Sequence, residues 1–220
     1  MTNYDTRFWV LAAGLSGMAG YVDAIGFLKL GGMFVSFMSG NSTQLAVGAV
    51  IDPAMASMAA RLLAGFVAGV VAGTWLAAMS GGRRKPIVLT FVGMILAVAA
   101  GTDGRFSDQV TTIMMAASMG AANTVFQRAG EVSIGVTYMT GTLVKFGQRL
   151  AGAVIGGPRW AWLPYLMLWV ALVGGAAAGA LAYSRLGTNG MWIAVAVAMV
   201  LAAYAAALGP AERVVVRTGR

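Results

Sequence analysis

Residues 35–48 read VSFMSGNSTQLAVG, and residues 136–145 read VTYMTGTLVK. Over their first six positions the two stretches keep Val, Met and Gly, exchange Ser for Thr twice, and exchange Phe for Tyr. These exchanges preserve hydroxyl hydrogen bonding and aromatic shape, so a common origin explains them better than chance. A second match lies upstream, where residues 20–23 (GYVD) correspond to residues 120–123 (GAAN). The sequence therefore predicts an internal duplication, whose most polar parts are these two stretches, the first and second motif.

The composition is that of a membrane protein. Of the 220 residues, 59% are hydrophobic and only 10% are charged, whereas a soluble domain carries about a quarter charged residues. A single polytopic membrane domain over residues 1–220 is expected. The net charge of +8 could point to nucleic acid, but the basic residues cluster in short loops and at the C-terminus. That placement indicates topology signals and contact with the lipid bilayer, so no nucleic-acid partner is expected.

The residue types argue against catalysis. The chain has no Cys and no His, which excludes disulfides and thiolate chemistry and removes the commonest metal ligand and general base. It also has no acidic pair within an apolar run and no glycine-rich phosphate loop followed by Lys. We therefore expect no enzyme activity, no metal site and no cofactor. The start of the chain lacks a cleavable signal pattern, so the first apolar run should stay in the membrane.

The chain has six apolar runs, and most of them are near the ~20 residues that a spanning helix needs. They cover residues 8–28, 56–80, 87–101, 109–126, 160–183 and 191–208. The motif segments, about residues 33–51 and 132–155, follow the first and fourth runs. The repeats are then residues 8–102 and 109–208. If each motif segment crosses the membrane, the repeats are parallel; if each dips in and returns, the repeats are inverted.

The positive-inside rule chooses between these topologies. With Arg83-Arg84-Lys85 and the Arg-rich tail both in the cytoplasm, the number of crossings between them must be even. Four apolar runs lie between them, so the second motif segment should not cross, and by symmetry neither should the first. The eight-crossing alternative places the cluster or the tail outside. The sequence therefore predicts an all-α polytopic membrane protein with about six transmembrane helices and two re-entrant or broken helical segments, arranged as two inverted repeats with both termini cytoplasmic.

The first motif resembles the start of a half-helix inside the membrane. In residues 39–43 (SGNST) a flexible Gly precedes side chains that are good helix N-caps. A helix start presents free N–H groups and the positive end of the helix dipole, which suits an anion or a carbonyl oxygen. Asn41, Gln44 and Gly48 fall on one helical face, and the matching positions of the second motif are Thr142, Lys145 and Arg149. One half-site is therefore neutral and polar, and the other is cationic.

Asp23 is the only acid well inside a predicted span, where a charge is costly. It could carry protons or cations, or it could cap the broken helix or pair with Lys29. Its repeat partner Asn123 cannot titrate. Lys145 and Arg149 either face a solute path or reach the cytoplasmic interface. The predicted substrate-binding residues, expected to meet near the middle of the membrane, are Asp23, Ser39, Gly40, Asn41, Thr43 and Gln44 with Asn123, Thr140, Gly141, Thr142, Lys145 and Arg149.

Small residues recur at helical spacing in two of the predicted spans. Gly65, Gly69 and Gly73 lie in one span, and Gly175 and Gly179 lie in another. This pattern is typical of close helix packing within a chain or between two copies of it.

Residues 20–27 (GYVDAIGF) and 34–43 (FVSFMSGNST) resemble the signature of the YoaK-type family of bacterial membrane proteins, a domain of unknown function of about this length. The resemblance implies a bacterial inner-membrane protein with about six helices. The family is loosely grouped with the major facilitator transporters, whose halves are built of inverted repeats. On that analogy the chain is one half of a transporter and forms a homodimer. The resemblance supplies no substrate and no catalytic residues.

Two classes of function follow. The first is a transporter or channel for a small polar solute, anionic or zwitterionic, with the motifs lining the path and Asp23 as the candidate for proton or cation coupling. The second is a membrane scaffold or accessory protein without transport activity.

Overall fold

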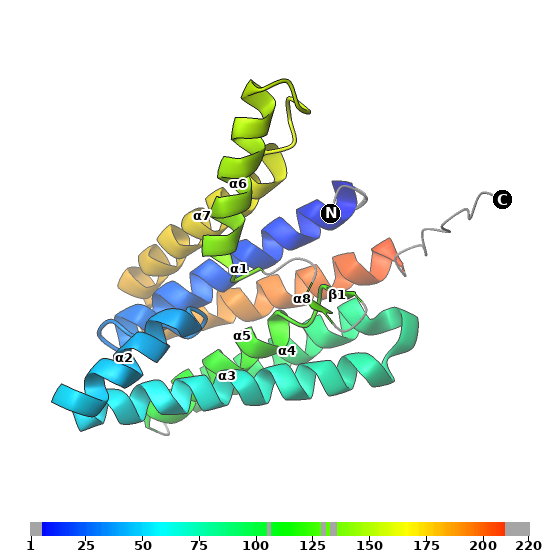
Figure 1. Cartoon of the computed structure of the whole chain (residues 1–220). Helices are drawn as coiled ribbons and strands as arrows, with labels where there is room; N and C mark the ends of the chain where they lie inside the picture. The colour runs from blue at the N-terminus through cyan, green and yellow to red at the C-terminus, as the bar shows by residue number, and fades with distance from the viewer. Residues whose placement is uncertain (1–5, 105–106, 129–130, 133–135, 210–220) are drawn as a thin grey trace.

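The computed structural model describes residues 6–104, 107–128, 131–132 and 136–209. The first five residues and the tail with Arg213, Arg217 and Arg220 lie outside the described residues, as does the topology predicted for both termini. The described chain is a bundle of α-helices with one very short hairpin (Figure 1). The predicted all-α class is therefore confirmed.

The helices coincide closely with the runs and motifs predicted from the sequence. They are α1 (Thr6–Lys29), α2 (Met38–Ile51), α3 (Pro53–Met79), α4 (Arg84–Thr102), α5 (Asp108–Ala122), α6 (Met139–Val154), α7 (Leu163–Leu186) and α8 (Met191–Leu208). Two 3-10 turns, η1 (Gly81–Arg83) and η2 (Gly187–Gly190), and the antiparallel strands β1 (Gln127–Arg128) and β2 (Glu131–Val132) complete the order. Local chemistry sets the ends: Asp52 accepts from the N–H groups of Ala54 and Met55, and Pro53 begins α3.

Four stretches of the described chain are long and apolar enough to cross a membrane: Arg7–Lys29, Pro53–Met79, Gly81–Thr102 and Leu163–Leu208. The last has 46 residues and contains α7 and α8, which meet at Gly187 with a φ of +57°. Large apolar side chains such as Val50, Val71 and Val154 are exposed on the bundle surface, as lipid contact requires. The chain is a multi-pass membrane protein.

Glycines let four helices approach until their backbones touch. A Cβ on Gly69 would collide with the backbone oxygen of Ala117, which brings α3 against α5. A Cβ on Gly175 would likewise collide with the backbone oxygen of Gly17, which brings α7 against α1. The glycine faces that we expected to serve either helix packing or dimer contact are thus buried inside the chain. The faces with Gly69 and Gly175 are filled from within the chain, whereas the site of Gly174 on α7 is open.

These two pairings are reciprocal. On α3, Gly69 and Gly73 face Ala117 and Ala121 of α5; on α7, Gly175 and Gly179 face Gly17 and Tyr21 of α1. Gly69 and Gly175 are separated by the same number of residues as Gly73 and Gly179. The step from Gly17 to Ala117 equals that from Tyr21 to Ala121. Each crossing therefore uses corresponding positions, and each joins a helix from the first half of the chain to one from the second. The remaining large pairing joins α4 to α8.

One end of the bundle gathers the starts of α1, α4 and α7 and the last turns of α8. The contacts are the rings of Trp9 and Tyr165 (centroids 6.0 Å apart), the Tyr204 hydroxyl with the carbonyl oxygen of Arg7 (3.4 Å), and Lys85 Nζ over the Phe8 ring (4.5 Å). We call it the basic end, because Arg7, Arg83, Arg84, Lys85 and Arg159 lie in or beside these turns.

The opposite end, called the ion-pair end, gathers the ends of α1, α4 and α7 and the starts of α3, α5 and α8. Lys29 Nζ lies 2.6 Å from Asp103 Oδ1 and 2.7 Å from Asp108 Oδ1. Arg61 donates to the side-chain oxygen of Gln109, and the Tyr21 hydroxyl donates to the backbone oxygen of Gly190 at 2.7 Å. Hence α1, α4 and α7 run from the basic end to the ion-pair end, and α3, α5 and α8 run the other way.

Candidate functional site

Residues 30–37 interrupt the helical structure between α1 and α2 and fold back onto α1. We call this segment the first break, and the corresponding segment before α6 the second break. After Lys29 the chain turns through Gly31 and Gly32, whose φ angles are +65° and +120°. The backbone N–H groups of Val35 and Ser36 then both donate to Asp23 Oδ1 at 2.8 Å. Asp23 lies about 9 Å along α1 from Lys29. The break therefore sits inside the bundle, and its carboxylate anchor is the acid that the sequence singled out.

Two side-chain amides of α2 hold this break in shape. Asn41 Nδ2 donates to the backbone oxygen of Phe34 at 2.5 Å, and the Phe34 N–H donates to Asn41 Oδ1 at 3.2 Å. Gln44 Nε2 donates to the backbone oxygen of Gly32 at 3.0 Å. Asn41 is fully buried, while Gln44 Oε1 is a buried atom with no hydrogen-bond partner in the described structure. Both predicted site residues thus serve the local fold, and Gln44 keeps one acceptor open.

The capping role predicted for residues 39–43 is wrong. Helix α2 begins at Met38, and the residue before it, Phe37, makes no side-chain cap. The Ser42 hydroxyl donates back to Met38 O at 2.8 Å, and Thr43 Oγ1 donates to Ser39 O at 3.3 Å. Hydroxyls inside the first turns prefer the carbonyl one turn earlier, so they cannot serve the free N–H groups. The N–H groups of Ser39 and Gly40 have no hydrogen-bond partner among the described residues.

The second break repeats the geometry of the first. Phe37 has φ −88° and ψ 76°, and the matching Tyr138 has φ −83° and ψ 57°, both close to an inverse γ-turn. The next N–H closes that turn in each copy, from Met38 to Ser36 O at 3.1 Å and from Met139 to Thr137 O at 2.9 Å.

The anchors of the two breaks also correspond. Asn123, which matches Asp23, accepts at Oδ1 from Thr137 Oγ1 at 3.0 Å, and Thr137 matches Ser36. Asn123 is almost fully buried just after α5, and its amide nitrogen donates to Met119 O at 2.9 Å. Thr142, matching Asn41, instead donates its hydroxyl to Tyr138 O at 3.1 Å. The two breaks therefore share the anchor and the turn, but not the amide clamp.

Both breaks attach to one face of α1. The buried Ser16 hydroxyl donates to the backbone oxygen of Val136 at 2.9 Å, beside Thr137. Ser16 and Asp23 are seven residues apart, which places them on one side of a helix and about 10 Å apart along it. Ser16 was missed by the sequence analysis, although a lone hydroxyl seven residues before the only acid of an apolar run was a usable signal.

The two motif helices themselves diverge from this meeting point. Within the described chain α2 packs on α3 and α6 packs on α7, and α2 and α6 do not pack on each other (Figure 1). Ser39, Thr43, Thr140, Lys145 and Arg149 lie on exposed helix surface. The convergence of these side chains on one solute stays a prediction. A side chain at Gly40 would collide with the ring of Phe37, whereas a side chain at Gly141 would meet no neighbouring atom.

The two motif helices differ at one contact position. Gly48 of α2 lies against the backbone nitrogen of Ala56, which a Cβ would approach to 2.6 Å. The matching residue of α6 is Arg149, whose side chain is exposed. Helix α6 projects over α7 (Figure 1), and the ring centroid of Phe146 lies 6.1 Å from that of Trp162, just before α7.

The described residues contain no group of three or more acidic, His or Cys side chains that could hold a metal ion. The site consists of two anchored breaks, backbone N–H groups, hydroxyls and amides. Such groups can bind a small polar solute by hydrogen bonding and by the helix dipole.

Comparison with known proteins gives relatives along nearly the whole chain. A family described as protein of unknown function (DUF1275) matches residues 11–204. The UPF0700 transmembrane protein RA0705 of Rhizobium meliloti (strain 1021) is 33% identical over 196 residues, covering 89% of this chain and 84% of that protein. The UPF0700 transmembrane protein YoaK of Bacillus subtilis (strain 168) is 29% identical over 143 residues, covering 61% of this chain and 63% of that protein. No solved structure matches.

Proposed function

The chain belongs to the DUF1275 family of transmembrane proteins of unknown function, and we propose that it moves a small polar solute across the membrane as a transporter or channel. The resemblance of residues 20–27 and 34–43 to the YoaK-type family is confirmed. The proposal depends on the architecture and on the two breaks, since the family supplies no substrate.

The proposed architecture has six crossings and two re-entrant segments. Helix α1 finishes and α3 begins at the ion-pair end, so the first motif segment returns to the end that it left. Helix α5 finishes near Thr124, which faces Gly73 of α3, and α7 begins at the basic end. The second motif segment therefore also returns. In this arrangement α1 and α5, α3 and α7, and α4 and α8 run in opposite directions, which supports two inverted repeats over residues 8–102 and 109–208.

The charge distribution supports the orientation. Arg7, Arg83, Arg84, Lys85 and Arg159 belong to the basic end, whereas the acids Asp103 and Asp108 belong to the other end. The positive-inside rule then favours a cytoplasmic basic end in a bacterial inner membrane, with both termini cytoplasmic.

The observation that carries the transport proposal is the docking of both breaks on one face of α1, at Ser16 and at Asp23. Backbone that leaves helical geometry within the membrane is tolerated where protein or a water-filled cavity surrounds it. Inverted-repeat transporters use paired breaks of this kind to hold their solute near the midplane. The open N–H groups at the start of α2 favour a carboxylate or another small anion, and Lys145 and Arg149 add positive charge along the approach from the basic end.

Asp23 is proposed as the coupling residue, for a proton or a cation. It is the titratable member of the anchor pair, and Asn123 is not. A homodimer is proposed only by analogy with half-transporters, because the glycine faces of α3 and α7 are used inside the chain.

The alternative, a membrane scaffold without transport, draws support from α6. Its apolar side chains Leu143, Leu150 and Val154 are exposed on one face, with Lys145 and Arg149 on another. A partner helix could dock there. A scaffold function, however, assigns no role to the two anchored breaks or to the open acceptor of Gln44.

Uptake into proteoliposomes tests the proposal. Purified protein is reconstituted, and currents or uptake are screened over small carboxylates, amino acids and neutral polar solutes. We expect Lys145→Ala to abolish uptake of the solute that is found, because it removes an exposed positive charge from the proposed approach to the site. Arg185→Ala, which removes an exposed cation at the other end of the bundle, is the matched control. Equal uptake by empty vesicles for every solute, or an unaltered rate for Lys145→Ala, would leave the scaffold as the better description.

A further inference from the structure

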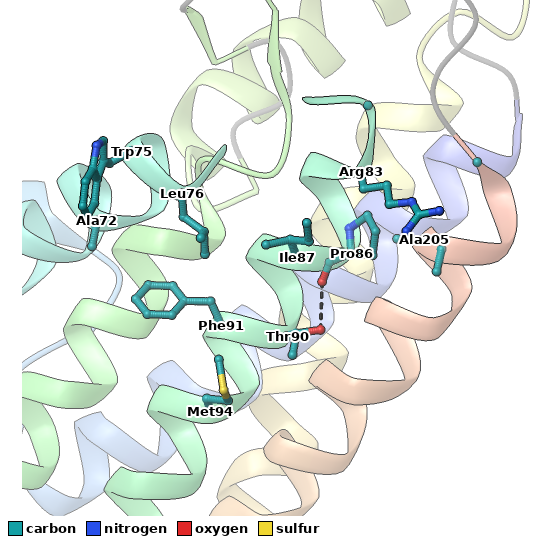
Figure 2. Close-up of a pocket in the computed structure, with 13 residues that line it drawn as sticks. Ala72, Trp75, Leu76, Arg83, Pro86, Ile87, Thr90, Phe91, Met94 and Ala205 are labelled. Carbon is teal, nitrogen blue, oxygen red and sulfur yellow. Dashed lines mark hydrogen bonds between the residues drawn. The ribbon is translucent and has the colours of Figure 1, made fainter. Parts of the chain in front are cut away.

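A groove on the bundle surface lies apart from the two breaks. It has a volume of about 930 Å³ and is bounded by α3, α4 and the last turns of α8 (Figure 2). Trp75 and Leu76 line it from α3, Phe91 and Met94 from α4, and Ala206 from α8. All of these side chains are apolar over most of their surface. Thr90 also lines it, but its hydroxyl is committed to Pro86 O at 2.9 Å, so the wall offers little hydrogen bonding (Figure 2).

The groove has one charged end. Arg83 lines it at the basic end and is exposed, and Arg84 and Lys85 follow directly. Lys85 is engaged with the Phe8 ring. In the described structure the guanidinium of Arg83 has no acidic partner, since Asp103 and Asp108 pair with Lys29 at the opposite end. The mouth therefore has positive charge available for an anion.

The length of the groove matches one leaflet of a bilayer. Met94 lies ten residues beyond Arg84, about 15 Å along α4. The hydrocarbon core of a bilayer is about 30 Å thick, so the groove runs from the headgroup level to near the midplane. An occupant must be anionic at one end and apolar along the rest.

We propose that this groove is a binding site for an anionic phospholipid, with the phosphate beside Arg83 and one acyl chain along Phe91 and Met94. Basic pockets between transmembrane helices bind anionic headgroups in this manner. A second copy of the chain fits poorly, because two copies docked face to face here would bring two Arg83–Lys85 clusters together. The proposal does not depend on transport, and its test has no transport readout.

Brominated lipids test the headgroup preference, because bromine on an acyl chain quenches a nearby tryptophan. The protein is reconstituted in phosphatidylcholine vesicles with a minor fraction of brominated phosphatidylglycerol or of brominated phosphatidylcholine. The difference between the parent and Trp75→Phe isolates the signal of Trp75 from the other five tryptophans. We expect stronger quenching by the brominated phosphatidylglycerol. Arg83→Gln should reduce this preference by roughly fivefold, as loss of one basic residue near a lipid surface predicts.

Arg185→Gln is the matched control, since it removes an exposed cation at the other end of the bundle and should leave the preference unchanged. Equal quenching by both brominated lipids would show ordinary solvation by lipid and overturn the proposal. So would an equal loss of preference in both arginine variants.

A second variant tests the acyl chain separately. Ala206 is exposed and lines the groove, so Ala206→Phe fills it without disturbing the core. It should lower the quenching of Trp75 by both brominated lipids, whereas Arg83→Gln should change only the headgroup preference. Unchanged quenching in Ala206→Phe would place the chain elsewhere and overturn the proposal. Disulfide formation between copies carrying Ala206→Cys, in a chain without native cysteine, would replace the lipid by a second copy.

Discussion

Ser16 donates its hydroxyl to the backbone oxygen of Val136 at 2.9 Å, so that α1 holds the break that precedes α6. Both residues are fully buried. Removing the hydroxyl leaves a buried carbonyl oxygen without its partner, at a cost of about 1–3 kcal/mol. We expect Ser16→Ala to lower the free energy of unfolding in detergent by that amount. Ser42→Ala, which removes an exposed hydroxyl bonded within its own helix, should change it little; equal effects would mean that the Ser16 bond is not specific.

Asp23 offers a test that separates anchoring from coupling. Asn at this position keeps an oxygen that can accept from the N–H groups of Val35 and Ser36. Asn123 already uses its side-chain oxygen in this way, accepting from the hydroxyl of Thr137. Asp23→Asn should therefore fold, while Asp23→Leu should lose the anchor and the stability of the first break. If Asp23 couples transport to a proton or cation, Asp23→Asn retains binding of solute but loses uptake driven by the ion gradient. Gradient-driven uptake equal to that of the parent would remove Asp23 from coupling.

The reciprocal crossings make a quantitative prediction about glycine. Gly69→Ala and Gly175→Ala each place a methyl group on a backbone oxygen of the partner helix, and neither helix can yield without moving its whole length. Both should destabilise the protein by 1–3 kcal/mol or more, by about equal amounts. Gly141→Ala, at an open site on α6, is the control. Thermal unfolding in detergent measures all three; a harmless Gly175→Ala would mean that α1 and α7 do not pack this closely.

The ion-pair end predicts an acid-sensitive component of stability. Burial raises the pKa of Asp103, but the hydrogen bonds from Lys29 and Thr188 outweigh it and hold this pKa below the ordinary value of 3.8. A depressed pKa contributes stability that is full above the unfolded value and is lost as the pH falls through the folded one. Stability should therefore drop below about pH 4, and Asp103→Asn should remove that part of the pH dependence. Lys29 keeps its second ion pair, with Asp108 at 2.7 Å, so the loss of Asp103 at neutral pH should be partly offset.

Topology can be read with single cysteines, because the chain has none of its own. Ser107→Cys lies on exposed surface at the ion-pair end, and Arg83→Cys lies on exposed surface at the basic end. A membrane-impermeant maleimide applied from outside to intact cells should label Ser107→Cys directly, and Arg83→Cys only after the membrane is opened. Labelling of Arg83→Cys in sealed cells would contradict a cytoplasmic basic end.

The sequence located the breaks well, and it assigned their side chains less well. The exchanges between the two motifs located both breaks, but the inverse γ-turns at Phe37 and Tyr138 were not predicted. Asn41 and Gln44 were assigned to a solute because a polar side chain in an apolar run must find some partner. A sequence does not show that the partner is a backbone carbonyl a few residues away, since the path of a loop decides which carbonyls are unpaired.

The sequence also did not predict which helices pack against each other. Gly69 and Gly175 predicted close helix packing. Small residues on one helix do not, however, identify which other helix packs against them. The pairing of the first half of the chain with the second emerges only from the contacts of Gly69 with Ala117 and of Gly175 with Gly17.

The packing of early helices on later ones has a consequence for how the protein is made. Helix α1 leaves the ribosome long before α7, so the face with Gly17 and Tyr21 must wait in the membrane until most of the chain has been synthesised. Helix α3 likewise waits for α5. Neither half of the chain is then a folding unit, because a chain cut after α4 keeps the glycine faces of α1 and α3 unfilled. The bundle is assembled once, when the last helices arrive.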